Sequence, residues 1–274
     1  MARTVAVAIV AVMLLMAPGR SLAATCYTGA QLAPIARAET AEIFILIDQT
    51  TAFPASVIAH LDAVLAMDSR AGTRISLFSF SAYTDGQYFQ PRGSFLFEGQ
   101  PTPAEIDNIG MRTQQNLQHC LVNQMSAGKR LLADRIALVA GAGAADTTYA
   151  NSDIIGSLRQ VGTRVAASRA RSRTLIVVSD MIQNMPGTSF YANGKLRVID
   201  PQLELRNVAR TGQFADLGGA RVYVVGGGLT GRSRDNQLRS ASQMNALELF
   251  WRGYIANSRA RLIEFGTPIP SMPR

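Results

Sequence analysis

Two aspartates that end apolar, strand-like runs are the residues of this sequence best suited to chemistry. Asp48 closes the run EIFILI and is followed two positions later by Thr50, and Asp180 closes the run RTLIVVS. Ser152 stands just ahead of the helical pattern that leads into the second run. Carboxylate and hydroxyl oxygens are ligands of hard divalent cations, and Mg²⁺ takes few direct carboxylates and keeps several waters. Asp48, Thr50, Ser152 and Asp180 therefore predict a site for Mg²⁺ or another divalent cation.

These residues can meet only if the chain folds into alternating strands and helices. Strand-like apolar runs lie near 42–48, 74–82, 94–98, 173–181, 220–228 and 261–266. Helix-period patterns lie near 54–67, 102–140, 153–165, 200–209 and 247–255. Such an alternation indicates crossovers over a parallel sheet. We expect an α/β fold with one doubly wound, mostly parallel sheet, helices on both faces, and 94–98 as a short antiparallel edge strand.

The carboxyl ends of the strands are where such a sheet carries its functional groups, near the point where the strand order reverses. Asp48 and Asp180 are both expected at those ends, and Ser152 is expected to cap the helix that precedes Asp180. A purely structural alternative is that both aspartates cap helix N-termini, where negative charge is favoured by the helix dipole.

The motifs around these residues resemble those of von Willebrand factor A (vWA) domains. The stretch DQTTA, which begins at Asp48, resembles the D-x-S/T-x-S motif of the metal-ion-dependent adhesion site of that family. Ser152 with its following aspartate resembles the threonine loop, and VVSDM resembles the strand that ends T-D-G. The resemblance implies that Asp48 and Thr50 are direct or near ligands, that Ser152 is a hydroxyl ligand or supports one, and that Asp180 binds through water.

Three positions depart from the family pattern. Ala52 stands where the second hydroxyl of the first motif belongs, so one ligand is missing. Thr147 and Thr148 compete with Ser152 for the role of the threonine loop. Met181 replaces the glycine of T-D-G. In order and spacing of elements the likeness covers most of residues 40 to 268.

The function implied by the resemblance is that of an exported protein-binding module. Its partner, a protein of unspecified identity, would fill an open position on the cation with an acidic side chain. The alternatives are a metal-dependent hydrolase using the same edge of the sheet, and a structural envelope protein with a vestigial metal site.

No complete catalytic constellation is present in the sequence. The G-x-S-x-G form of a nucleophile elbow is missing, and Thr50 stands where a phosphatase of the haloacid dehalogenase type needs a second acid. The stretch GGGLTG, 226–231, matches dinucleotide spacing, but no acidic residue ends a next strand about 20 residues on. We therefore expect no enzymatic activity.

The first 23 residues have the form of a secretory signal peptide, with an early arginine, an apolar run and the small-residue triplet Ser21-Leu22-Ala23. We expect an exported chain, periplasmic or secreted, whose residues 24–274 form a single domain with a helical and loop insertion near 100–150. No later segment has the roughly 18 uninterrupted apolar residues of a membrane helix.

The two cysteines, Cys26 and Cys120, predict a disulfide, because an even number of cysteines in an exported chain is usually paired. Two unrelated thiols are the alternative. They do not predict a zinc site, because His60 and His119 are isolated and lack paired ligand spacing.

The excess of basic residues also bears on which partners the chain could bind. Without the leader, 25 basic residues stand against 19 acidic ones, a net charge of +6. The basic clusters are Arg164, Arg169, Arg171 and Arg173, and then Arg232, Arg234 and Arg239. No aromatic residues interleave with the first cluster, which argues against nucleic acid. A solvated basic face is the plain interpretation, and attraction to an anionic envelope or an acidic partner is the alternative.

Two apolar segments have predicted places. A one-sided helical stripe is expected to cover the sheet as core: Leu247, Phe250, Trp251, Tyr254 and Ile255. The segment SFYANGKL, 189–196, follows Asp180 and is expected to be a loop or hairpin. Phe190 and Tyr191 in it are candidates for partner contact, with a plain connection as the alternative.

Overall fold

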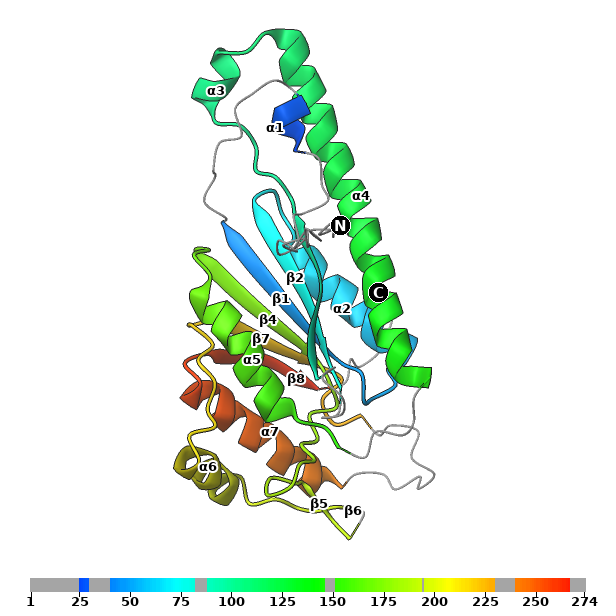
Figure 1. Cartoon of the computed structure of the whole chain (residues 1–274), viewed down its shortest axis with the longest axis vertical. Coiled ribbons are helices and arrows are strands. Elements are labelled where there is room, and N and C mark those ends of the chain that lie inside the picture. The colour runs from blue at the N-terminus through cyan, green and yellow to red at the C-terminus, as the bar shows by residue number, and fades with distance from the viewer. Residues whose placement is uncertain are drawn as a thin grey trace, which may run out of the picture.

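The computed structural model describes residues 25–29, 40–81, 88–145, 151–193, 195–229 and 240–266. Its centre is one six-stranded sheet in the order β3-β2-β1-β4-β7-β8 (Figure 1). The strands are β1 Ala41–Asp48, β2 Thr73–Phe80, β3 Phe89–Leu96, β4 Ser172–Val178, β7 Arg221–Val225 and β8 Arg261–Gly266. All neighbouring pairs are parallel except β2 with β3. The predicted α/β fold with a mostly parallel sheet is confirmed.

Several sequence predictions fall outside the described residues. They are the leader 1–23, the competing hydroxyls Thr147 and Thr148, the second arginine cluster, and the end of GGGLTG from Thr230. Of the described helices, none combines the length and apolar character needed to cross a bilayer.

Helices cover both faces of the sheet, which explains why β1 is apolar throughout its middle. Ile43, Ile45 and Ile47 pack with α2 (Ala55–Asp68) and the second half of α4 (Met111–Ala145). Phe44 and Leu46 face the other way, towards α5 (Ile154–Ala167), α6 (Pro201–Arg210) and α7 (Ala241–Asn257). Because successive side chains of a strand point to opposite faces, a strand buried on both needs a continuous apolar run.

The predicted aromatic core helix is confirmed as α7. Phe250, Trp251 and Tyr254 are fully buried, and the Trp251 indole donates a hydrogen bond to the Met181 carbonyl at 2.8 Å. Phe190 was a candidate for partner contact, and that prediction is wrong. Its ring is 1% exposed and meets Phe250 edge to face at 5.1 Å. The ring thus anchors the hairpin of β5 (Tyr191–Ala192) and β6 (Lys195–Leu196) on the core.

The region near 100–150 is more regular than the sequence suggests. A short helix, α3 (Pro103–Asp107), is capped by Thr102, and α4 then runs unbroken for 35 residues. At 1.5 Å per residue this helix is roughly 50 Å long. Its second half lies on the sheet and its first half projects beyond it, beside α1 (Cys26–Gly29) and α3 (Figure 1). We call α1, α3 and the first half of α4 the head.

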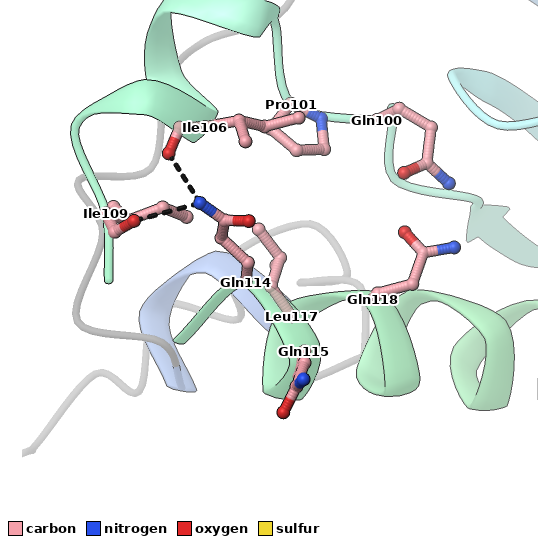
Figure 2. A pocket seen from close by; sticks show the side chains of 8 residues that line it. All are labelled: Gln100, Pro101, Ile106, Ile109, Gln114, Gln115, Leu117 and Gln118. Atoms are coloured by element: carbon pink, nitrogen blue, oxygen red, sulfur yellow. Dashed lines mark hydrogen bonds between the residues drawn. The ribbon is translucent and has the colours of Figure 1, made fainter. Parts of the chain in front are cut away.

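The head lies past the edge where the parallel strands begin. Leu96 at the end of β3 pairs with Arg74 at the start of β2, so the chain leaves the sheet at this edge to enter the head. A small pocket of about 260 Å³ lies between α3 and α4 (Figure 2). There the Gln114 amide donates to the carbonyls of Ile106 and Ile109, at 2.9 and 3.0 Å. These bonds satisfy carbonyls at the end of α3 and hold it against α4.

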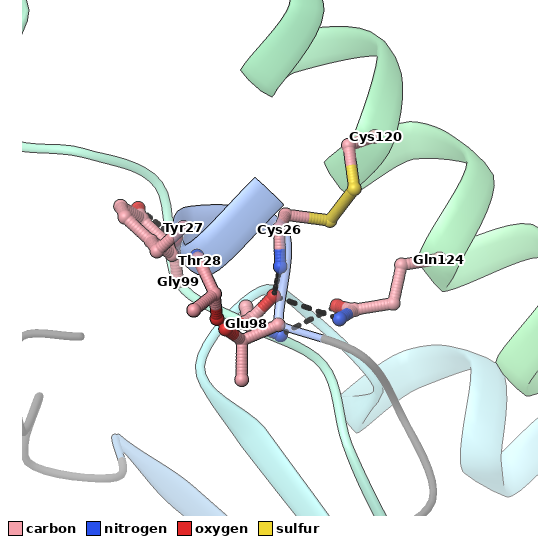
Figure 3. The surroundings of a disulfide bond; sticks show 8 residues. Cys26, Tyr27, Thr28, Glu98, Gly99, Cys120 and Gln124 are labelled. Carbon is pink, nitrogen blue, oxygen red and sulfur yellow. Dashed lines mark hydrogen bonds between the residues drawn. A yellow bond between two sulfur atoms is a disulfide. The ribbon is translucent and has the colours of Figure 1, made fainter. Parts of the chain in front are cut away.

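A disulfide between Cys26 and Cys120 joins α1 to α4, which confirms the predicted pairing (Figure 3). Its surroundings are a small buried cluster of Tyr27, Leu117 and Leu121 with the bridge itself. The Glu98 carboxylate accepts from the Cys26 backbone N–H at 2.7 Å and from the Gln124 amide at 2.8 Å. The bridge and this carboxylate together fix α1 to α4 within the head.

Removing the bridge by Cys26→Ser with Cys120→Ser is expected to destabilise the fold. The bridge closes a loop with a sequence separation of 94, for which the chain-entropy model gives about 4 to 5 kcal/mol. Urea unfolding followed by Trp251, the single tryptophan, measures the loss in the sheet core. Because α4 is continuous from head to sheet, the transition is expected to shift to lower urea. An unchanged Trp251 transition would show that the head unfolds on its own.

Candidate functional site

The candidate site lies at the carboxyl ends of β1 and β4. These are the central strands of the sheet, where the chain order reverses from β3-β2-β1 to β4-β7-β8. In open α/β sheets this switch point is the usual place for ligands. The structure brings Asp48, Thr50 and Ser152 into one hydrogen-bonded cluster here, and their role as cation ligands stays a prediction.

Asp48 is the centre of the cluster. Its side chain has 0% exposure, and both carboxylate oxygens accept hydrogen bonds. Oδ1 accepts from the Thr50 hydroxyl at 2.6 Å and the Thr50 backbone N–H at 2.8 Å. Oδ2 accepts from the Ser179 hydroxyl at 2.7 Å. A carboxylate so enclosed cannot reach a substrate as a nucleophile, which argues against a hydrolase built on Asp48.

Ser152 joins the cluster from a third segment of the chain. The Thr50 hydroxyl lies 3.3 Å from the Ser152 hydroxyl. Ser152 is held in place by its backbone, which exchanges two hydrogen bonds with Asn184 at 3.0 and 2.9 Å. The loops after β1, before α5 and after β4 therefore converge on one point.

The predicted role of Ser152 as helix cap is wrong, because that position belongs to Asp153. The Asp153 carboxylate accepts from the Gly156 backbone N–H at 2.9 Å and from the Tyr88 hydroxyl at 2.7 Å. The pairing of Ser152 with Asn184 sets where the helix begins. A side chain at Gly156 would collide with the Asp153 carboxylate and the Tyr88 hydroxyl, which explains a glycine in the first turn.

Asp180 lies next to the cluster, half-buried, just past the end of β4. One carboxylate oxygen, Oδ1, accepts from the Ile182 backbone N–H at 2.9 Å and closes a local turn. The Asp180 carbonyl accepts from the N–H of Gly228 at 2.9 Å. Gly226 and Gly228, the first two glycines of the stretch with dinucleotide spacing, thus form a tight turn against this loop, and both have positive φ.

Ser179 is the residue of this cluster that the sequence analysis missed. The register pairs Ile47 with Val178, and one further step places Ser179 beside Asp48. The Ser179 hydroxyl also accepts from the Met181 backbone N–H at 2.9 Å, so it links the Asp48 carboxylate to the following loop. A parallel register assigned between the two apolar runs would have found it.

Met181 stands where the vWA pattern has glycine, and its backbone takes the conformation that glycine favours. Its φ is +62°, although its side chain is fully buried. A left-handed conformation costs a residue with a Cβ about 1 to 2 kcal/mol. The turn after Asp180 therefore holds Met181 in a backbone conformation that glycine would adopt without this cost.

Burial decides the protonation behaviour of Asp48. The pKa of its carboxyl group is raised above 3.8, because desolvation outweighs the hydrogen bonds from Thr50 and Ser179 that favour the charged form. Among the described residues, no group of three or more His, Cys, Asp or Glu side chains could hold a metal. A cation at this edge would therefore depend on hydroxyl ligands as well as carboxylates.

Comparison with known proteins leaves the family open. No protein-family model matches the chain, and no curated protein matches it. Among solved structures it is similar to the crystal structure of an aerotolerance-related membrane protein from Bacteroides fragilis with multiple mutations to serine. That match has a TM-score of 0.35 and 12% identity, and it covers 82% of this chain and 92% of the other. A likeness this weak carries no argument about function.

The raised pKa of Asp48 gives the Asp48→Asn variant a pH-dependent effect. Between the unfolded pKa and the raised folded pKa, the native state binds more protons than the unfolded state, so wild-type stability falls as pH rises. The asparagine side chain does not titrate, so the variant lacks this loss of stability with rising pH. In the presence of chelator, its free energy of unfolding relative to wild type is expected to increase with pH and then level off.

Urea denaturation between about pH 4 and pH 8 measures this difference. Asp134→Asn, at an exposed position of α4, controls for the loss of one negative charge. A relative stability of Asp48→Asn that falls with rising pH would contradict the dominance of burial.

The left-handed backbone of Met181 predicts an unusual order of stability. Met181→Ala and Met181→Gly both lose a buried side chain, which costs about 2 to 5 kcal/mol. At a positive φ glycine avoids the Cβ penalty, so Met181→Gly is expected to be more stable than Met181→Ala by about 1 kcal/mol.

Thermal or urea unfolding of the two variants tests this order. Ala133→Gly, at an exposed position in the interior of α4, is the control with the opposite order of stability, because there glycine is less stable than alanine by about 1 kcal/mol. Equal stability of the two Met181 variants would show that the turn relaxes when the side chain is lost.

Proposed function

We propose that the chain is a protein-binding module of the vWA type, which engages a partner protein at the carboxyl edge of β1 and β4 with the help of a divalent cation such as Mg²⁺. The observation that carries the proposal is the convergence of Asp48, Thr50 and Ser152 at the switch point of the sheet. The Thr50 hydroxyl donates to the neighbouring Asp48 carboxylate at 2.6 Å, and it lies 3.3 Å from the hydroxyl of Ser152, which is 102 residues further along the chain.

The donor set fits a hard cation. The Thr50 and Ser152 hydroxyls would hold it, the Asp48 carboxylate orients Thr50, and Asp180 is the second carboxylate at the same edge. Mg²⁺ prefers oxygen ligands, needs one or two carboxylates and retains waters, so the hydroxyl lost at Ala52 leaves a position for water. When bound, the cation supplies a positive charge with a position open to an acidic side chain of the partner.

The turn at Met181 supports the same family. Glycine, which the T-D-G pattern has at this position, adopts a positive φ readily, and Met181 has a φ of +62° here. The saturation of both Asp48 oxygens supports the competing idea of a vestigial site, in which hydroxyls satisfy the carboxylate without a metal. The two ideas differ in whether a cation changes stability.

A thermal-shift titration with Mg²⁺, Mn²⁺ or Ca²⁺ against chelator tests the proposal. A ligand that binds only the native state stabilises it by RT ln(1 + [L]/Kd), about 2.7 kcal/mol at one hundred times Kd. Wild type is expected to gain stability, and Thr50→Val is expected to lose the response because the methyl group offers no ligand.

Ser168→Ala is the matched control. Ser168 donates to the Glu42 carboxylate at 2.6 Å at the opposite end of the same strand, so its loss removes a comparable hydrogen bond away from the site. The control is expected to keep the full cation response. If wild type responds to none of the three cations at millimolar concentration, the metal-assisted function is withdrawn in favour of the vestigial site.

A further inference from the structure

Arginines gather at the edge of the sheet opposite Asp48. In this fold the helices end where the parallel strands begin, so residues from both kinds of element share that edge (Figure 1). The arginines lie near the ends of α5, α6 and α7 and at the starts of β4, β7 and β8: Arg164, Arg169, Arg171, Arg173, Arg210, Arg221, Arg259 and Arg261. Arg221 and Arg261 are register partners on adjacent strands.

Five of these side chains are available to a partner. Arg164, Arg169, Arg171, Arg210 and Arg261 are exposed, and no side-chain hydrogen bond or ion pair engages them within the described part of the chain. We call these five the arginine edge. The other three are engaged within the protein: Arg173 with the Gly218 carbonyl, Arg221 with the Thr174 hydroxyl, and Arg259 with Asp216.

Two acidic side chains that the structure describes at this edge, Asp216 and Glu42, do little to neutralise the arginine edge. Asp216 is already paired with Arg259 at 2.8 Å. Glu42 is buried, and its carboxylate accepts hydrogen bonds from Ser76 at 3.2 Å and Ser168 at 2.6 Å. The exposed guanidinium groups therefore add up to one positive field along the edge.

Helix stability explains only part of this arrangement. A cation in the last turn of a helix complements the helix dipole, and Arg164 and Arg210 occupy such positions. Arg169, Arg171 and Arg261 lie beyond the helices, in the connection to β4 and at the first position of β8. For these three, no side-chain hydrogen bond or ion pair with another described residue accounts for the charge.

The residue type points to phosphate. Of the 27 basic residues only Lys129 and Lys195 are lysines, and the planar guanidinium of arginine matches phosphate oxygens with two parallel hydrogen bonds. The segments 164–173 and 259–261 contain no aromatic residue on which bases could stack, which disfavours single-stranded nucleic acid. The charges are spread over two helix ends and two strand starts, so they fit an extended anionic surface better than one small anion.

We propose that the arginine edge docks the protein on a membrane surface rich in anionic phospholipids. Docking through this edge leaves the opposite edge, with Asp48 and Thr50, turned away from the lipid and open to a partner. The inference does not depend on a bound cation at that site.

Sedimentation with lipid vesicles tests the proposal on the full chain. The variant Arg169→Gln with Arg171→Gln and Arg261→Gln removes the three charges that have no role in a helix. On vesicles of phosphatidylcholine with about 30% phosphatidylglycerol, each lost arginine is expected to weaken binding about fivefold, and all three together about a hundredfold. Wild-type binding is expected to weaken with added salt and to be much lower on pure phosphatidylcholine.

A matched variant controls for net charge. Lys129→Gln with Arg130→Gln and Arg135→Gln removes three exposed positive charges from the second half of α4, outside the head, and is expected to bind vesicles nearly as well as wild type. All these proteins share the same N-terminus, so an apolar leader would contribute equally. Urea unfolding confirms that each variant is folded.

Several outcomes would overturn the inference. They are unchanged binding by the edge variant, an equal loss in the α4 variant, or equal binding of wild type to the two kinds of vesicle. Binding of wild type to duplex DNA but not to anionic vesicles at the same salt would assign the arginine edge to nucleic acid instead.

Discussion

The parallel pairing of β1 with β4 is the constraint on which the rest of the structure depends. Both strands are buried on both faces, and their register carries Asp48 next to Ser179 at the end of the pair. A carboxylate placed there without partners would be costly, because burial disfavours its charged form. The Thr50 and Ser179 hydroxyls meet that need, and in doing so they fix the loops that follow both strands. The geometry of the candidate site is thus a consequence of how the core is closed.

The same strand carries a second buried carboxylate at its other end. Glu42 and Asp48 lie on the same face of β1, and each accepts hydrogen bonds from serine or threonine hydroxyls. The surroundings differ, however. Asp48 lies where three loops converge at the switch point, whereas Glu42 contacts Ser168 at the end of α5 and Ser76 on β2. This difference makes the Asp48 end of β1, and not the Glu42 end, the candidate for a cation site.

The long helix α4 joins two parts of the molecule whose buried apolar clusters are separate. Leu132, Ile136 and Val139 pack on the sheet core, while Leu117 and Leu121 belong to the separate cluster around the disulfide. Near the site, the Gln49 side chain donates to the Val139 carbonyl at 3.4 Å. The disulfide therefore fixes the first half of α4 to α1, and the loop after Asp48 contacts the second half of α4. The arginine edge lies where the parallel strands begin, and the candidate site lies at the opposite edge, where they end.

Much of this could be predicted from the sequence, and the limits have physical causes. Apolar runs and helical periodicity determined the fold class, the core role of Trp251 and the placing of Asp48 at a strand end, because burial imposes those patterns locally. The pairing of Cys26 with Cys120 was also accessible, since only two cysteines exist. Tertiary structure alone decided that Ser179 shares the Asp48 carboxylate, that Asp153 rather than Ser152 caps α5, and that Phe190 is core. Each of these depends on strand register or on a contact between distant segments, and neither is encoded in any local stretch of residues.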